Sequence, residues 1–311
     1  MRKQIRKFLN VFGYDVVKVN VHSDKKAGKT STVMVGNYPI DMPGNNWLIS
    51  AYKYQPDNNS QLGRLAKVIA GKYPGHTVID IGANVGDTIA VLKTAIDLPV
   101  IGIEGDPISC RFLEKNVKQF SNITLIREYL GEKKQTLQVT MGKDGWNNTL
   151  LPAEQGQGKE VQLQTLDEVL QGHQLHNRIL KLLKIDTEGF DTIILRGAFD
   201  LLRQQQPVLY FEYNKSNMQA IGEDGLSTLF SLQQYGYRTL VIFDNKGRYL
   251  LSAPLTDKAL ITDLHHYPDE DKSQVAYFDV CLFHENDQEL AARFIEGERG
   301  LGDFGIGKLG N

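Results

Sequence analysis

The segment VIDIGANVGDT, residues 78 to 88, decides the fold class of this chain. It begins with apolar residues and then breaks into a loop that contains two glycines, an asparagine and two aspartates. A buried strand that ends in a glycine loop before a helix is typical of the first unit of an open parallel sheet. Ligands of such sheets bind at the carboxyl ends of the strands, so we expect a ligand at this loop.

The acids in this loop indicate which ligand it binds. A Walker A loop has a lysine directly after its second glycine, and none follows Gly86. A dinucleotide fingerprint needs glycines where this loop has Asn84 and Asp87. Asp80 and Asp87 would repel a pyrophosphate and favour a cation. S-adenosylmethionine carries an ammonium and a sulfonium and has no phosphate, so the loop predicts this cofactor.

Glu104 supports the same cofactor, because it ends the next predicted strand, 22 residues after Gly82. An acid about 20 residues after such a loop accepts hydrogen bonds from ribose hydroxyls. A purely structural turn, with Asp87 capping the helix, leaves Asp80 and Glu104 without a joint role. The end of the third strand should lie near the adenine. The candidate cofactor-binding residues are Asp80, Gly82, Ala83, Asn84, Gly86, Thr88, Glu104, Gly105, Glu128 and Tyr129.

Strands and helices alternate outward from this loop. Short apolar strands are predicted at 77–81, 100–104, 123–128, 182–186, 207–212, 238–244 and 275–284. Uniformly apolar strands separated by helices indicate an α/β fold, a parallel sheet covered by helices on both faces. Only about 16 residues separate Ala253 from Asp269, so we expect the closing strand to enter by a hairpin-like route and to run antiparallel.

The middle of the chain differs from this alternation. Residues 135–142 and 159–166 alternate with period two, which predicts an inserted β pair. The polar loop between them, which we assign to 144–152, carries Trp146, which suits contact with a carbohydrate or a cofactor, or covers the sheet edge. The predicted organisation is an N-terminal extension or cap at 1–60, a main domain at 61–284 with its β insertion at about 131–166, and a C-terminal helix and glycine-rich tail at 285–311.

Composition sets limits on partners and location. The chain has 311 residues, a net charge of −2 and a pI of about 6.4, so it has no global basic field for nucleic acid. No segment approaches the roughly 20 apolar residues that span a bilayer. Cys110 and Cys281 are the only cysteines, and two isolated thiols fit a reducing cytosol, so we expect a cytoplasmic protein. The oligomeric state stays open.

Five segments occur in an order that resembles the FkbM family of S-adenosylmethionine-dependent methyltransferases. They are VIDIGANVGDT, GIEGDP, QTLDEVL, LLKIDTEGFDTIILRGA and PVLYFEYN, and the resemblance runs from about residue 60 to 284. It implies a Rossmann-like seven-strand sheet of order 3-2-1-4-5-7-6 with strand 7 antiparallel. It also implies methylation of a hydroxyl oxygen, commonly on a sugar, polysaccharide or natural product. Asp191 stands where the family usually has glutamate.

Methyl transfer to an alcohol needs in-line alignment and a base. Alignment supplies several kcal/mol, and a positioned carboxylate adds about 10²–10⁴-fold. Asp186 ends the fourth predicted strand and is the first candidate for the base, with Glu188 the second. Glu188 also suits a helix start, where it would complement the dipole. Glu212, Asn214 and Trp146 are the candidate residues for binding the acceptor.

Two alternatives and a metal stay open at this point. Asp186, Glu212 and Asn214 offer oxygen ligands for Mg²⁺, but nothing in their spacing requires a metal and none is predicted. One alternative is a non-catalytic module that binds S-adenosylmethionine, and the other is a nucleotide- or NAD-dependent Rossmann enzyme. Asn84 in a glycine position argues against the second, and the set of acids argues against the first.

Overall fold

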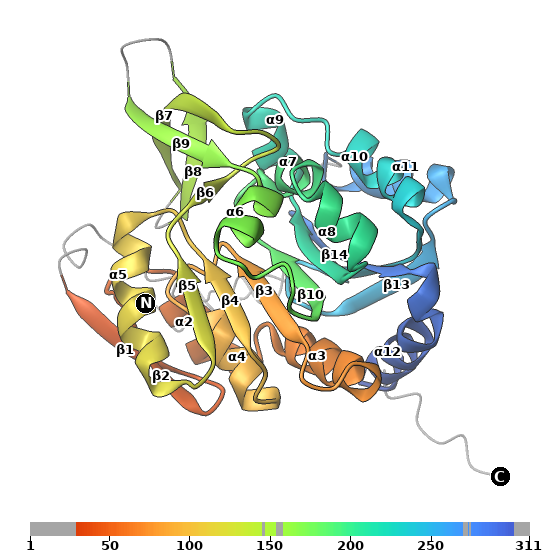
Figure 1. The fold of residues 1–311 in the computed structure, drawn as a ribbon, viewed down its shortest axis with the longest axis horizontal. Helices are drawn as coiled ribbons and strands as arrows, with labels where there is room; N and C mark the ends of the chain where they lie inside the picture. Colours follow the sequence, from red (N-terminus) through yellow and green to blue (C-terminus); the bar gives the residue numbers. More distant parts are fainter. Residues whose placement is uncertain (1–28, 145–146, 154–157, 270–272, 274, 302–311) are drawn as a thin grey trace, which may run out of the picture.

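The computed structural model describes residues 29–144, 147–153, 158–269, 273 and 275–301, and its central feature is an eight-stranded sheet (Figure 1). The strand order is β13-β12-β14-β11-β10-β3-β4-β5. The strands are β3 (Thr77–Ile81), β4 (Val100–Ile103), β5 (Ile123–Ile126), β10 (Leu180–Ile185), β11 (Val208–Tyr213), β12 (Tyr237–Asp244), β13 (Tyr249–Pro254) and β14 (Phe278–His284).

All seven strands of the main sheet that the sequence predicts are present, in the expected order. Strands β5, β4, β3, β10 and β11 are parallel, and β14 runs antiparallel between β11 and β12. This confirms the order 3-2-1-4-5-7-6 with an antiparallel seventh strand, and the Rossmann-like α/β class. Strand β13 was not predicted; it turns back from β12 and adds an eighth strand at the edge.

The prediction that the closing strand enters by a hairpin-like route is wrong. Helix α11 (Lys258–His266) lies between β13 and β14, so the chain crosses back through a helix. The side chain of Asp257 accepts a hydrogen bond from the backbone N–H of Leu260 and caps this helix. The sequence carried this signal, an aspartate directly before the helix. The antiparallel direction of the strand is nevertheless as expected.

The insertion is a four-stranded sheet of order β6-β9-β7-β8, larger than the predicted pair. Strands β7 (Gln135–Asp144) and β9 (Lys159–Gln164) form the predicted pair, and they run antiparallel. Strands β6 (Tyr129–Leu130) and β8 (Asn147–Pro152) complete the sheet, so the assignment of 147–152 to a loop is wrong. Pairing with β7 makes this segment a strand. Its sequence, NNTLLP, lacks the alternation of apolar and polar residues that would have predicted one. Trp146 lies outside the described residues.

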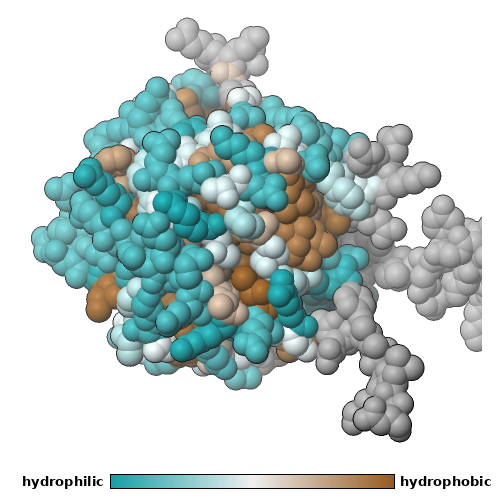
Figure 2. Space-filling view, turned by 90° about the vertical axis from the view of Figure 1, so that its right-hand side faces the viewer, coloured by the Kyte–Doolittle hydropathy of each residue, from teal (hydrophilic) through white to brown (hydrophobic). Residues whose placement is uncertain are grey.

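Helices cover both faces of the main sheet. One apolar cluster joins the sheet to α3 (Ser60–Lys72), α4 (Asp87–Ala95), α5 (Pro107–Asn116) and α12 (Gln288–Leu301). The other joins it to α6 (Leu166–Gly172), α7 (Asp191–Arg196), α8 (Phe199–Gln204), α9 (Lys215–Ala220), α10 (Leu226–Ser231) and α11. Viewed from the side of β13 and α12, the surface is mainly hydrophilic with a band of apolar residues (Figure 2). None of the helices in the described ranges is long and apolar enough to cross a membrane.

The segment before the main sheet is ordered, although its sequence reads as irregular. Strands β1 (Thr30–Val35) and β2 (Tyr38–Pro43) form a hairpin, and helix α2 (Leu48–Tyr54) follows. Their apolar side chains, including Val35, Ile40 and Tyr52, pack on the outer side of α4. The hairpin and α2 therefore rest on the helix that begins at the glycine loop.

Candidate active site

A cavity of about 670 Å³ lies at the carboxyl ends of β3, β4, β10 and β11. The chain builds β4 and β5 on one side of β3 and then crosses to β10 on the other, so the cavity lies at the switch point of the sheet. The glycine loop, the segment after β10 and helix α2 all contribute to its wall. This is the position that the sequence predicts for a ligand.

Gly82 allows the glycine loop to pack directly against the segment after β10. Its φ is +71°, and a Cβ there would lie 1.9 Å from the carbonyl oxygen of Asp186. No other residue fits without moving one of the two backbones. The loops that end β3 and β10 are therefore in contact at the floor of the cavity.

Glu104 is fixed by the loop and still has capacity for a ligand. Its Oε2 accepts from the N–H of Asn84 at 2.8 Å, and its Oε1 accepts from the N–H of Asp106 at 2.7 Å. Each carboxylate oxygen has a further lone pair, and Glu104 lines the cavity. Burial raises the pKa of this carboxyl, while the two backbone donors oppose the shift. This geometry suits an acceptor of hydroxyl hydrogen bonds.

Tyr129 forms the far wall of this end of the cavity. A Cβ on Gly105 would lie 2.4 Å from the Tyr129 ring, so the ring lies directly on that glycine. Glu128 and Leu130 line the cavity beside it. The exit of the third strand therefore lies next to the loop that carries Glu104.

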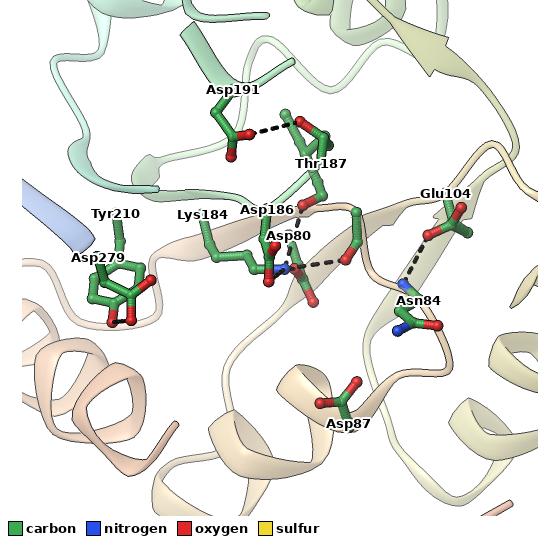
Figure 3. Close-up of polar contacts among 12 residues, drawn as sticks. Asp80, Asn84, Asp87, Glu104, Lys184, Asp186, Thr187, Asp191, Tyr210 and Asp279 are labelled. Carbon is green, nitrogen blue, oxygen red and sulfur yellow. Dashed lines mark hydrogen bonds and ion pairs between the residues drawn. The ribbon is translucent and has the colours of Figure 1, made fainter. Parts of the chain in front are cut away.

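Asp80 does not face the cavity, which changes the physical argument made for it from the sequence. Its side chain is fully buried, and Lys184 Nζ lies 2.9 Å from its Oδ1. Lys184 also donates to the carbonyl oxygen of Gly82 at 3.1 Å (Figure 3). Burial raises the pKa of Asp80 and Lys184 opposes the shift. Lys184 neutralises the charge of Asp80, so any effect of Asp80 on a ligand passes through Lys184 and the loop.

Sequence reasoning missed Lys184, although it lies inside the segment KIDTEGFD. Asp80, Lys184 and Tyr210 are in register across β3, β10 and β11. The available signal was a lysine directly after two leucines in the strand predicted at 182–186. It became interpretable only once the register placed it opposite an aspartate.

Asp87 is bound to the N-terminal segment. It is the first residue of α4, and the hydroxyl of Tyr52 in α2 donates to its Oδ2 at 2.9 Å. Burial raises its pKa to about 6, against the effect of the Tyr52 hydrogen bond. Asp87 and Thr88 line the cavity, whereas Gly86 and Ala83 belong to the same loop but do not line it. Its place in the first turn complements the helix dipole.

Asp186 is an exposed carboxylate that lines the cavity. It follows β10, 45% of its side chain is exposed, and its Oδ2 lies 3.7 Å from Lys184 Nζ (Figure 3). The buried Asp191 shapes the turn after it, because its Oδ2 accepts from the Thr187 hydroxyl at 3.2 Å and from the Gly189 N–H at 3.3 Å. Asp191, a departure from the usual glutamate, therefore has a structural role here.

The comparison with protein-family models gives the decisive observation. The Methyltransferase FkbM domain matches residues 80–239, just over half of the chain. The chain belongs to the FkbM methyltransferase family. The match covers the glycine loop, the insertion and the segment that carries Asp186. A search of curated proteins found no significant match.

Solved structures with related folds include other methyltransferases. The FkbM methyltransferase from Methylobacillus flagellatus KT is 15% identical, with a TM-score of 0.39, over 68% of this chain and 43% of that one. The chain thus spans less than half the length of that protein. The METTL16 methyltransferase domain is 12% identical, with a TM-score of 0.42, over 80% and 74% of the two chains. Precorrin-6y C5,15-methyltransferase from Geobacter metallireducens GS-15 is 13% identical, with a TM-score of 0.34, over 70% and 86%.

Glu188 in this FkbM-family chain is held by a side-chain partner as well as by its place near a helix. Its φ is +55°, a conformation that non-glycine residues adopt at a cost. Asn217 Nδ2 donates to its Oε2 at 2.8 Å, and Glu188 lines the cavity. This contact joins the carboxylate to α9, and Glu188 lines the cavity together with Asp186.

Glu212 and Asn214 lie together at the end of β11. Asn214 Nδ2 donates to Glu212 Oε1 at 3.2 Å, while Asn214 Oδ1 accepts from the Asn217 N–H at the start of α9. Burial and the charges of Asp186 and Glu188 raise the pKa of Glu212 well above its usual value. Both residues line the cavity. Part of Asn214 is thus committed to capping α9.

Asp279 and Tyr210 are further members of the site that the sequence did not suggest. Gln61 Nε2 donates to the Tyr210 hydroxyl at 2.8 Å, and this hydroxyl donates to Asp279 Oδ2 at 3.0 Å. Asp279 lines the cavity, and burial followed by the charge of Asp186 raises its pKa to about 7. In Figure 3 this pair and the Glu104–Asn84 pair lie on opposite sides of Lys184. The cavity therefore has two polar ends joined at the lysine.

Metal binding gains no support from the geometry of the described residues. Within them, no group of three or more histidine, cysteine, aspartate or glutamate side chains is arranged to hold a metal ion. Asp186, Glu212 and Asn214 all line the cavity, and Asn214 already donates to Glu212.

Proposed function

We propose that this chain is an S-adenosylmethionine-dependent methyltransferase that acts on a hydroxyl oxygen of a sugar, polysaccharide or natural product. The observation that carries the proposal is the exposed Asp186 carboxylate, which lines the cavity together with the glycine loop and Glu212. Membership of the FkbM methyltransferase family supports it independently.

The residues at the Glu104 end fit the proposed cofactor. Glu104 has lone pairs for ribose hydroxyls, and Gly82 and Gly105 keep the floor open to close approach. Tyr129 offers an aromatic wall for the adenine, with Glu128 beside it as a hydrogen-bond acceptor. The acidic lining suits a ligand that carries an ammonium and a sulfonium and no phosphate. When bound, S-adenosylmethionine supplies an electrophilic methyl group.

Asp186 is our candidate for the base, and Glu188 is the second. Asp186 would accept the proton of the acceptor hydroxyl as the new oxygen–carbon bond forms. Its partial exposure gives an incoming hydroxyl access, whereas Glu188 is already bonded to Asn217. Glu212 and Asn214 would hold the acceptor from the β11 side. Trp146, outside the described residues, remains an expectation for acceptor contact.

Helix α2 supports the proposal that residues 1–60 form a cap on a methyltransferase domain at 61–284. Leu48 and Ala51 of α2 line the cavity, and Tyr52 binds Asp87 at the start of α4. The helix therefore closes the cofactor side of the cavity, where exclusion of water would favour the transfer.

The first experiment is calorimetric titration with S-adenosylmethionine, with NAD as the control ligand and with and without Mg²⁺. Micromolar binding of S-adenosylmethionine supports the cofactor. A panel of hydroxylated sugars is then tested for O-methyl products by mass spectrometry. Binding of NAD in place of S-adenosylmethionine would refute the proposal, and cofactor binding with no turnover on any acceptor would favour a binding module.

Asp186→Asn tests the base directly. We expect this variant to keep the affinity for S-adenosylmethionine and to lose about 10²–10⁴-fold in kcat, because the amide cannot take the proton. Asp200→Asn, an exposed change on α8, is the matched control. Normal turnover in Asp186→Asn would remove Asp186 as the base and move the assignment to Glu188.

A further inference from the structure

Lys184 is the common partner of three groups, one on strand β3, one in the glycine loop and one after β10. Its Nζ lies 2.9 Å from Asp80 Oδ1, 3.1 Å from the Gly82 carbonyl oxygen and 3.7 Å from Asp186 Oδ2. Its side chain is only 4% exposed. Gly82 belongs to the loop at the cofactor end, and Asp186 is the proposed base. One buried ammonium thus connects the two halves of the site.

Lys184 is also the one cation among the described residues that line the cavity. Burial by itself would lower its pKa, but the charges of Asp80 and Asp186 outweigh burial and raise it above its usual value. The lysine therefore stays protonated at neutral pH. Five carboxyl groups interact electrostatically with it: Asp80 on β3, Asp87 on α4, Glu104 after β4, Asp186 after β10 and Asp279 on β14, while β11 places Tyr210 beside it.

Neutralising Asp80 does not by itself account for this arrangement. A lysine that served only as a counter-ion would need one carboxylate partner, yet this one also binds the loop carbonyl and lies within ion-pair distance of Asp186. A mispositioned group at a reacting centre costs on the order of 10²-fold in rate. If Lys184 holds Asp186 against the glycine loop, its removal should therefore lower the rate of transfer by a measurable factor.

We propose that Lys184 is a positioning residue for methyl transfer, which holds the Asp186 carboxylate over the glycine loop and joins the base to the cofactor half of the cavity. The inference rests on the proposed function. It adds a residue that contacts neither the acceptor nor the reacting atoms in this assignment and acts through Asp186.

Three variants separate positioning from charge balance. Lys184→Met removes the ammonium. Asp80→Asn/Lys184→Met removes the buried ion pair as a whole, so it is expected to fold even where the single variant leaves an unpaired buried aspartate. Lys181→Met is the matched control on the same strand, since Lys181 donates to the Gln205 carbonyl away from the cavity.

The readouts are turnover against pH, acceptor KM and hydrogen exchange of the full unliganded chain. We expect both Lys184 variants to lose about 10²-fold in kcat, with acceptor KM within a few fold. The acid limb of the kcat profile should move to higher pH, because loss of the cation favours the protonated form of the surrounding carboxyls. The Asp186 amide, which donates to the Ile81 carbonyl, should exchange faster in both variants than in Lys181→Met.

Wild-type kcat, pH profile and exchange in the double variant would overturn the inference, because Lys184 would then only balance Asp80. An active wild type with this result would leave the proposed function intact. If the wild-type chain binds no S-adenosylmethionine or transfers no methyl group, the proposed function fails. Exchange at Asp186 in the unliganded variants would then still decide whether Lys184 joins the two loops.

Discussion

At the scale of the residue, the site depends on positions whose chemistry cannot be exchanged. Gly82 is set by backbone contact with Asp186, and Glu104 by two backbone donors. Asp80 is a buried partner of Lys184 and does not reach the cavity. The two loop acids that suggested a cationic cofactor therefore have different places. Asp87 lines the cavity, whereas Asp80 is buried and pairs with Lys184.

Gly82→Ala is predicted to lose cofactor binding and to destabilise the chain by several kcal/mol, because its Cβ would overlap the Asp186 backbone. Gly75→Ala is a matched control, since Gly75 has a similar φ of +69° and nothing within 4 Å of a built Cβ. The control should cost only the roughly 1–2 kcal/mol of left-handed backbone strain. Urea unfolding and calorimetry measure both effects. Equal losses in the two variants would show that the close contact is unimportant.

At the scale of the element, helices and strands far apart in sequence complete the cavity. Helix α2 reaches the start of α4 through Tyr52, and β11 reaches β14 through Tyr210. Both hydroxyls donate to carboxylates whose pKa is raised by burial. These two contacts join α2 to the start of α4 and β11 to β14.

Tyr52→Phe is predicted to destabilise the chain by about 1–3 kcal/mol, because it leaves the buried Asp87 carboxyl without its donor. Tyr54→Phe removes a hydroxyl from an exposed side chain of the same helix and should have almost no effect. Chemical denaturation of both variants makes the comparison. A loss in Tyr52→Phe no larger than in Tyr54→Phe would show that α2 is not held through Asp87.

The raised pKa of Asp279 predicts a stability that falls as pH rises. Its pKa is about 7 in the folded chain against 3.8 for an aspartate in water, so the folded state binds more protons between these limits. The free energy of unfolding from this group is therefore greatest below about pH 4 and is lost as pH rises toward 7. Asp279→Asn should make the slope of this free energy against pH less negative from pH 4 to 7. An unchanged slope in urea titrations would contradict the prediction.

At the scale of the whole molecule, the cavity has a strongly acidic lining although the net charge of the chain is only −2. Its described acidic residues are Asp87, Glu104, Asp106, Glu128, Asp186, Glu188, Glu212 and Asp279, against the single cation of Lys184. The fold gathers these acidic side chains at the carboxyl edge of the sheet. An effect of charge on ligand choice would therefore come from this arrangement and not from composition.

We therefore predict that neutral hydroxylated acceptors are methylated in preference to the same compounds bearing phosphate or carboxylate groups. Repulsion by the cavity should lower kcat/KM for the anionic acceptors by tenfold or more at low salt, and the difference should shrink as salt screens it. Matched pairs, such as a hexose and its phosphate, provide the test. Equal or higher kcat/KM for the phosphate would refute it.

The sequence by itself determined the parallel sheet and the family, because the apolar strands and the local segments VIDIGANVGDT and KIDTEGFD carry that information in neighbouring residues. The strand order followed from the family resemblance. It also located Glu104, Asp186 and Glu212 at strand ends, where side chains of parallel strands meet. The edge strand β13, strand β8 and helix α11 were missed, because pairing or capping decides these segments more than their hydrophobic pattern.

Only the tertiary structure decided the partners within the site. Lys184 meets Asp80 through the register of β3 and β10, and Asp279 meets Tyr210 across β11 and β14. Such pairs join residues about 70 to 100 positions apart. Hydrophobic periodicity places a residue on a face of its own element, whereas the charge that faces it depends on which strand lies alongside and at what offset, and sheet formation alone sets that offset.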